Sequence, residues 1–181
     1  MGAGKSTIGK NLAWYMGFRF IDLDNYIEGK LGCTVAAFFE QHGEVAFRKA
    51  ELDALREIIA AEAGAGVTGA SSRKNEAKKG LILSLGGGTV VTPECIALVK
   101  EHTRCVYLHC PKHILLKRLI RNCDKRPLLA GKRPEELDAY VTALIARRES
   151  VYEECARITF HLDDERSLRL IIEELADVVL K

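Results

Sequence analysis

The chain has 181 residues, 48% of them hydrophobic and 29% charged, and its 27 basic and 25 acidic residues leave a formal net charge of +2. The length suits a single domain, residues 1–181, with a full hydrophobic core. The balanced charge offers no basic surface of the kind that binds nucleic acid or an anionic membrane. No apolar run approaches the ~18 residues of a membrane-spanning helix, and the N-terminus lacks the regions of a signal peptide. We therefore expect a cytoplasmic protein.

Strand-like and helix-like stretches alternate along the chain, a pattern typical of a parallel sheet with helices on both faces. The first helix is expected at about Lys5 to Met16. Four strands are predicted, at residues 18–24, 81–88, 104–110 and 157–163. Further helices are expected to begin near Pro93, Pro111 and Pro134, because proline favours the first helical position. The last helix follows residues 163–167 and carries apolar residues at helical spacing.

Two segments interrupt this alternation. Residues 63–80 are rich in glycine, alanine, serine and charge, which predicts a flexible surface insertion. Residues 121–137 are dense in basic residues and contain two prolines, so we expect a mobile lid that handles anions.

Cysteines and histidines are scattered along the chain. The six cysteines form no CxxC pair, which argues against a zinc ribbon or a redox motif, and we expect no metal site among the five scattered histidines. We expect the cysteines to be reduced, in keeping with the cytosol.

The segment GAGKST resembles the second half of a phosphate-binding loop. Its backbone N–H groups and the positive end of the following helix would face nucleotide phosphates. Lys5 would reach the β- and γ-phosphates, and the Ser6 hydroxyl would bind Mg²⁺. The loop's other glycine would lie two residues before Met1, so we expect the first strand to be missing from this chain. The alternative is a glycine-rich helix start with a capping serine.

Two further groups of residues suit phosphoryl transfer. Asp22 and Asp24 are expected at the end of a strand, on one face, where they suit a magnesium-bound water and an attacking hydroxyl. The alternative is that they only form turns and caps. The glycine triplet, Gly86, Gly87 and Gly88, would let the backbone approach a ligand closely.

Three arginines complete the candidate site. Arg48 and Arg148 lie on helical patterns, where a guanidinium can bind a carboxylate with two parallel hydrogen bonds. Arg126 lies in the expected lid, where it could close over ATP and neutralise charge on the transferring phosphoryl group. A single surface arginine is more often just solvated, so their weight comes from the ensemble.

The segments GAGKST, FIDLD, EVAFRKAE, LSLGGGTV, RPLL and ARRESVYEE occur in this order, and with them the chain resembles the shikimate kinase family over almost its whole length. The resemblance implies an α/β, three-layer P-loop fold like that of nucleoside monophosphate kinases, with a parallel sheet of order 2-3-1-4-5. It also implies ATP-dependent phosphorylation of the 3-hydroxyl of shikimate, in the pathway to chorismate and the aromatic amino acids.

The resemblance also assigns roles to individual residues. The nucleotide would be bound by Gly2, Ala3, Gly4, Lys5, Ser6, Thr7, Arg118, Arg126 and, as a weaker candidate, Arg166. Shikimate would be bound by Asp24, Arg48, Gly86, Gly87, Gly88 and Arg148. The catalytic residues would be Lys5, Asp24 and Arg126. Mg²⁺ would be bound by Ser6 and, through water, by Asp22.

Two other functions stay open at this point. One is a kinase for a different small hydroxy acid, such as gluconate, and the other is an inactive, non-catalytic relative of the kinases. We expect the partners to be shikimate and ATP, with no nucleic acid and no membrane, and we expect a monomer.

Overall fold

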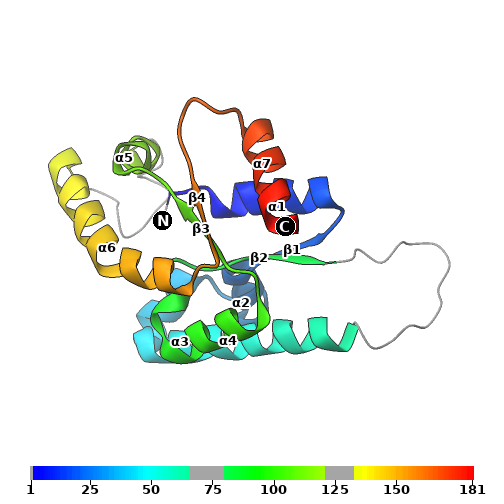
Figure 1. The fold of residues 1–181 in the computed structure, drawn as a ribbon. Helices are drawn as coiled ribbons and strands as arrows, with labels where there is room; N and C mark the ends of the chain where they lie inside the picture. The colour runs from blue at the N-terminus through cyan, green and yellow to red at the C-terminus, as the bar shows by residue number, and fades with distance from the viewer. Residues whose placement is uncertain (1, 66–79, 121–132) are drawn as a thin grey trace. The chain divides into compact units, whose positions relative to one another are not determined.

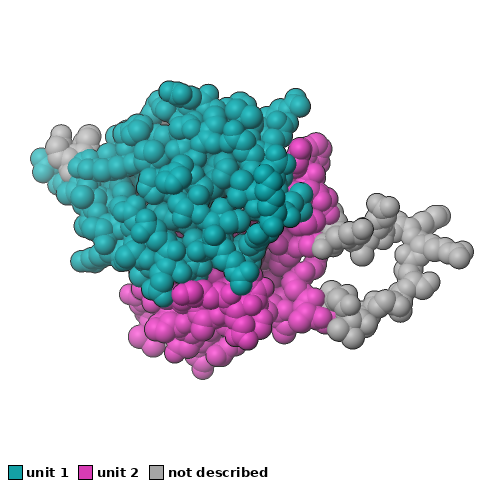
Figure 2. Space-filling model, in the orientation of Figure 1, with its two compact units in different colours: residues 1–5, 104–181 teal, residues 6–103 magenta. Residues whose placement is uncertain are grey.

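The computed structural model describes residues 2–65, 80–120 and 133–181, in which helices alternate with four short parallel strands (Figure 1). The chain forms two compact units, one of residues 1–5 and 104–181 and one of residues 6–103 (Figure 2). Most of the predicted insertion and of the predicted lid lies outside the described residues. The single domain of residues 1–181 stays a prediction.

The unit of residues 6–103 is built on strands β1 (Arg19–Asp22) and β2 (Leu81–Ser84). The strands are parallel, with Arg19 opposite Leu81 and Asp22 opposite Ser84. The other elements are α1 (Lys5–Met16), whose first residue belongs to the other unit, α2 (Leu23–Leu31), α3 (Val35–Ala65), the 3₁₀ turn η1 (Thr89–Val91) and α4 (Pro93–His102).

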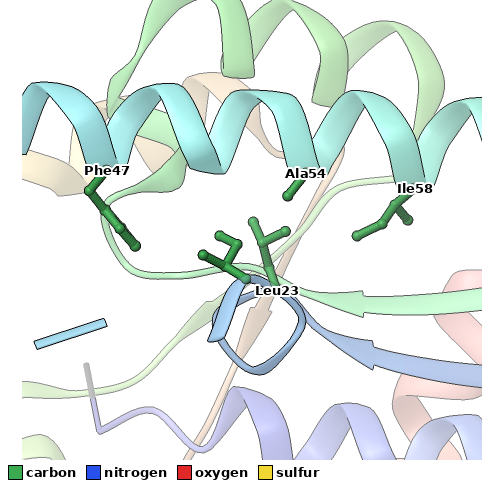
Figure 3. Close-up of a cluster of buried hydrophobic side chains, with 5 residues drawn as sticks. Leu23, Phe47, Ala54 and Ile58 are labelled. Atoms are coloured by element: carbon green, nitrogen blue, oxygen red, sulfur yellow. The ribbon is translucent and has the colours of Figure 1, made fainter. Parts of the chain in front are cut away.

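A cluster of buried apolar side chains joins α2 to α3 (Figure 3). Leu23 and Ile27 from α2 pack against Phe47, Ala54 and Ile58 from α3. Burying a side chain of this size stabilises a fold by about 1.5–3 kcal/mol. The cluster therefore fixes the stretch of α3 between residues 47 and 58 against the end of β1, where α2 begins.

Helix α3 consists of two helical segments that meet at Gly43. The φ of Gly43 is 77° and its ψ is 176°, a conformation that residues with a side chain rarely adopt. The second segment can therefore take its own direction, and it carries the apolar residues of the cluster described above.

The unit of residues 1–5 and 104–181 is built on strands β3 (Val106–His109) and β4 (Ile158–His161). These strands are also parallel, with Val106 opposite Ile158 and His109 opposite His161. The helices of this unit are α5 (Lys112–Ile120), α6 (Pro134–Cys155) and α7 (Leu168–Leu180). A buried cluster joins α5 to α6 through Leu119, Leu137 and Val141.

The structure confirms most of the predicted elements. The first helix runs from Lys5 to Met16, α4 and α6 begin at their prolines, and α5 begins one residue after Pro111. All four predicted strands form, and each is shorter than predicted. The expected order 2-3-1-4-5 counts a first strand that we expect to be missing, so β1 to β4 correspond to its strands 2 to 5. In that order strand 2 adjoins strand 3 and strand 4 adjoins strand 5, as the observed pairs β1–β2 and β3–β4 do. Within the described residues, no helix is long and apolar enough to cross a membrane.

One prediction about the elements is wrong. Asp24 was expected on a strand beside Asp22, but β1 ends at Asp22 and Asp24 lies in the first turn of α2. The cause is the side chain of Asp22, which caps α2 by accepting a hydrogen bond from the backbone N–H of Asn25. An aspartate at this position satisfies an amide that the helix leaves without a partner.

Candidate functional site

The first glycines of the chain adopt backbone conformations that residues with a side chain rarely adopt. The φ of Gly2 is 80° and that of Gly4 is 90°, and α1 begins directly afterwards at Lys5. A glycine-rich segment therefore leads directly into a helix N-terminus, whose first amides have no partner within the helix. Such amides are suited to bind phosphate oxygens. A side chain on Gly2 would also meet Leu119 of α5, since its Cβ would lie 3.2 Å from Leu119 Cδ2.

Ser6 and Asp22 are brought together within the unit of residues 6–103. The Ser6 hydroxyl donates a hydrogen bond to Asp22 Oδ2 at 2.5 Å. Asp22 Oδ1 accepts the capping bond from Asn25 N at 3.4 Å. A hydroxyl oxygen from the first turn of α1 and a carboxylate oxygen from the end of β1 therefore lie side by side. Oxygen atoms of this kind are the ligands that Mg²⁺ prefers. The residues present fit the ion that the sequence predicted.

Asp24 lies against the glycine triplet although it is not on a strand. A Cβ added to Gly86 would lie 2.8 Å from Asp24 Oδ1, 3.0 Å from Thr89 Oγ1 and 3.2 Å from Glu51 Oε1. The turn after β2 thus approaches three oxygen-bearing side chains, and only glycine leaves room for them. The structure thus brings together Asp24 and Gly86, two residues that the resemblance assigned to one site.

Arg48 is held in a fixed position by two carboxylates on its own helix. Its Nη1 donates to Glu51 Oε2, and its Nη2 donates to Glu44 Oε1 at 3.0 Å. Burial acts to lower the pKa of Arg48, but the hydrogen bonds and charges of Glu51 and Glu44 together outweigh it and raise that pKa. Arg48 also adjoins the glycine triplet, because a Cβ on Gly88 would lie 2.6 Å from Nη2.

Glu51 and Thr89 are site residues that the sequence analysis missed. The Glu51 side chain is only 1% exposed, and its Oε1 accepts a hydrogen bond from Thr89 Oγ1 at 2.7 Å. Glu51 therefore ties Arg48 to the residue that follows the glycine triplet. The signal was present for Glu51, which stands three residues after Arg48 and hence on the same helix face. No sequence signal connects Thr89 to either residue.

The remaining predicted residues lie in the unit of residues 1–5 and 104–181, except for Thr7, which is exposed in α1. Arg118 Nη1 donates to the backbone oxygen of Ala3 at 3.2 Å, so this arginine contacts the glycine-rich loop. Arg166 binds Asp163, Glu174 and the backbone oxygen of His161. Arg148 is half-buried on α6. Arg126 lies outside the described residues.

Comparisons with known proteins match this chain to one family over almost its whole length. The family described as "Shikimate kinase" matches residues 1–180. A shikimate kinase of Chlorobium phaeobacteroides is 40% identical over 179 residues, covering 96% of this chain and 84% of the relative. A shikimate kinase of Enterococcus faecalis is 36% identical over 176 residues, covering 97% of this chain and 91% of the relative.

Solved structures agree as well. A shikimate kinase from Acinetobacter baumannii, solved in complex with shikimate, matches with a TM-score of 0.79 and 30% identity, over 99% of this chain and 88% of that one. A shikimate kinase from Bacteroides thetaiotaomicron matches with a TM-score of 0.82 and 27% identity, over 100% of this chain and 94% of that one. The fold and these likenesses define a kinase of the α/β class. The chain belongs to the shikimate kinase family.

Proposed function

We propose that the protein transfers the γ-phosphoryl group of ATP to the 3-hydroxyl of shikimate, giving shikimate 3-phosphate and ADP on the way to chorismate and the aromatic amino acids. The observation that carries this proposal is the family match over residues 1–180. The relative solved with shikimate covers almost the whole chain, which supports the same acceptor.

On the nucleotide side, the glycine-rich loop from Gly2 to Thr7 holds the phosphates with its backbone amides. Lys5, at the start of α1, neutralises charge on the β- and γ-phosphates. Ser6 and Asp22 hold Mg²⁺, the latter through water. When bound there, Mg²⁺ neutralises charge that develops on the phosphate oxygens.

Three arginines also serve the nucleotide. Arg118, which contacts the loop at Ala3, packs near the adenine. Arg166 is the weaker candidate for the same side, because the bonds to Asp163 and Glu174 already tie its guanidinium into its own unit. Arg126 closes over the transferring phosphoryl group and stabilises its charge.

On the acceptor side, Arg48 and Arg148 bind the carboxylate of shikimate. Arg48 uses three of its five N–H groups on Glu44 and Glu51, which leaves one N–H on each Nη for a carboxylate. The glycine triplet, Gly86 to Gly88, lets its backbone approach the ring. Glu51 is a positioning residue, because it acts on shikimate only through the guanidinium that it holds.

Asp24 lies at the step where the bond forms. Its carboxylate orients the 3-hydroxyl and accepts its proton as the oxygen attacks the γ-phosphorus. A general base of this kind contributes typically 10²–10⁴-fold to the rate, so its removal acts on turnover more than on binding.

We further propose that the enzyme acts as a monomer in the cytoplasm. The cysteines of the described segments are free thiols, which suits a reducing compartment. Light scattering on the purified protein tests the monomer, for which a dimer mass is the contrary result.

The function is tested with purified protein, Mg·ATP and a coupled measurement of ADP release. We expect release that depends on shikimate, with ³¹P NMR showing a new phosphomonoester on the product. Asp24→Asn, which keeps the size of the side chain and removes the base, is the matched control and should lose this activity. ADP release with gluconate but not with shikimate would overturn the proposed acceptor. No ADP release with any acceptor would overturn the proposed kinase activity.

A further inference from the structure

Two histidines that stand far apart in the sequence meet on the sheet of β3 and β4. His109 and His161 are 52 residues apart and face one another as cross-strand partners at the ends of the two parallel strands. Their Nδ1 atoms are 3.2 Å apart, and their ring centroids are 4.8 Å apart. Nothing in the sequence marks residues 52 apart as a pair, and the strand register brings them together.

The distance between the two nitrogens suits a shared metal ion. Histidine nitrogens bind Zn²⁺ at about 2.0–2.1 Å. Two such nitrogens lie about 2.9 Å apart when the angle at the metal is near 90°, and about 3.4 Å apart at a tetrahedral angle. The observed 3.2 Å falls between these values. To share an ion, the rings must turn from facing one another so that both lone pairs point at it.

A carboxylate on α6 prepares one of the rings for this role. Glu149 Oε1 lies 3.4 Å from His109 Nε2. A proton on Nε2 is attracted to this carboxylate, which leaves the Nδ1 lone pair of His109 available on the side of His161. Ligating histidines commonly have such a carboxylate on their other nitrogen, where it fixes the tautomer and the ring orientation.

The surroundings hold His109 in place and leave the pair open to solvent. The ring of Tyr107 packs edge-on against His109, with centroids 5.8 Å apart. The side chain of His109 is 31% exposed, that of Glu149 is 37% exposed, and His161 is exposed. The pair therefore lies at the surface of its unit, and one of its rings is held by two neighbouring side chains.

We propose that His109 and His161 form a binding site for a divalent ion of the late first transition row, such as Zn²⁺, Ni²⁺ or Cu²⁺. Imidazole nitrogen is a ligand suited to these ions, whereas Mg²⁺ prefers oxygen. The described residues contain no group of three or more metal-binding side chains, so water completes the coordination. The site uses none of the residues that serve ATP or shikimate above.

The test is a Zn²⁺ titration of the full chain, labelled with ¹⁵N in its histidines and free of nucleotide, followed by long-range ¹H–¹⁵N spectra of the rings. We expect the Nδ1 signals of His109 and His161 to shift together and to saturate together, and we expect no such shift with Mg²⁺. Independent shifts of the two rings, or equal shifts with Mg²⁺, would overturn the site.

Variants separate a shared ion from binding at single rings. His161→Gln should abolish the response of His109 in the same range of Zn²⁺, and Glu149→Gln, which keeps both rings, should weaken binding about tenfold. His102→Gln is the matched control, because His102 also has a carboxylate neighbour, Glu101 at 3.7 Å; it should leave both shifts unchanged. Undiminished Zn²⁺ binding at His109 in His161→Gln, or an unchanged affinity in Glu149→Gln, would refute the proposal.

Discussion

Gly88→Ala tests whether the position of Arg48, rather than its charge alone, determines shikimate binding. The φ of Gly88 is −109° and its ψ is −6°, values that do not require glycine. The added Cβ would lie 2.6 Å from Arg48 Nη2 and 2.7 Å from Nη1. Ordinary van der Waals contact of a Cβ begins near 3.4 Å. Since 2.6 Å is 0.8 Å shorter than this, the guanidinium must move away from the new methyl group by about 0.8 Å.

The size of the effect follows from the bonds that this movement disturbs. Hydrogen bonds to charged groups are worth about 1.5–3 kcal/mol, and each 1.4 kcal/mol is a factor of ten in affinity. We therefore expect the KM for shikimate to rise roughly tenfold to a hundredfold. The turnover number should change little, because a contact to the carboxylate is made equally in the ground state and the transition state.

The assay measures initial rates against shikimate at saturating ATP. Gly29→Ala is the matched control, since Gly29 is an exposed glycine of α2 whose Cβ would meet nothing within 4 Å; it should leave the KM unchanged. In an Arg48→Ala background, Gly88→Ala should add no further rise in KM. A further tenfold rise in that background, or an unchanged KM in Gly88→Ala alone, would refute the reasoning.

Three other predictions concern Mg²⁺, the lid and alkaline pH. Asp22→Asn should keep the melting temperature, because asparagine caps a helix as well as aspartate, and should raise the Mg²⁺ concentration for half-maximal rate; Asp22→Ala should in addition lose about 1 kcal/mol of unfolding free energy. Arg126→Ala should lower turnover at least about 100-fold with little change in the shikimate KM. Steady-state kinetics that show an unchanged turnover and a raised KM would contradict this prediction. Burial, with the charge and hydrogen bond of Cys155, raises the pKa of Cys105 from 9.0 to about 12. The stability gained by keeping this thiol protonated is complete below pH 9 and is lost as the pH rises to about 12. Urea titrations should show the unfolding free energy falling over this range, and falling less in Cys105→Ala.

Elements whose start has a local chemical cause were predictable from the sequence. The glycines before Lys5 and the prolines at residues 93 and 134 mark helix starts, because each suits a backbone position that a helix start requires. All three helices begin at the predicted residue. The four strands were also found, since short β-rich runs lie between these helices.

The end of β1 was not predictable from its apolar pattern alone. Ile21 and Leu23 alternate with Asp22 and Asp24, which is the period of a strand. Leu23 is nevertheless completely buried in the cluster of α2 and α3, and a helix can bury it as well as a strand can. The capping bond of Asp22 decides in favour of the helix, and a short apolar run does not contain that information.

The side chains that surround the glycine triplet could not be predicted from spacing along the chain. From the sequence, three glycines indicate that a ligand approaches the backbone closely. In the structure, the space that side chains on Gly86 and Gly88 would fill is occupied by the protein's own Asp24, Glu51 and Arg48.

These three side chains come from α2 and α3, and they meet the turn after β2 only because both helices pack into one core. Spacing finds the pair Arg48 and Glu51, which share a helix face three residues apart. It does not find Thr89, which is 38 residues from Glu51 and binds its other oxygen. The glycines are therefore required first by the positions of Asp24, Glu51 and Arg48. If Asp24 and Arg48 bind shikimate as we propose, a substitution in the triplet should act on shikimate through these two side chains.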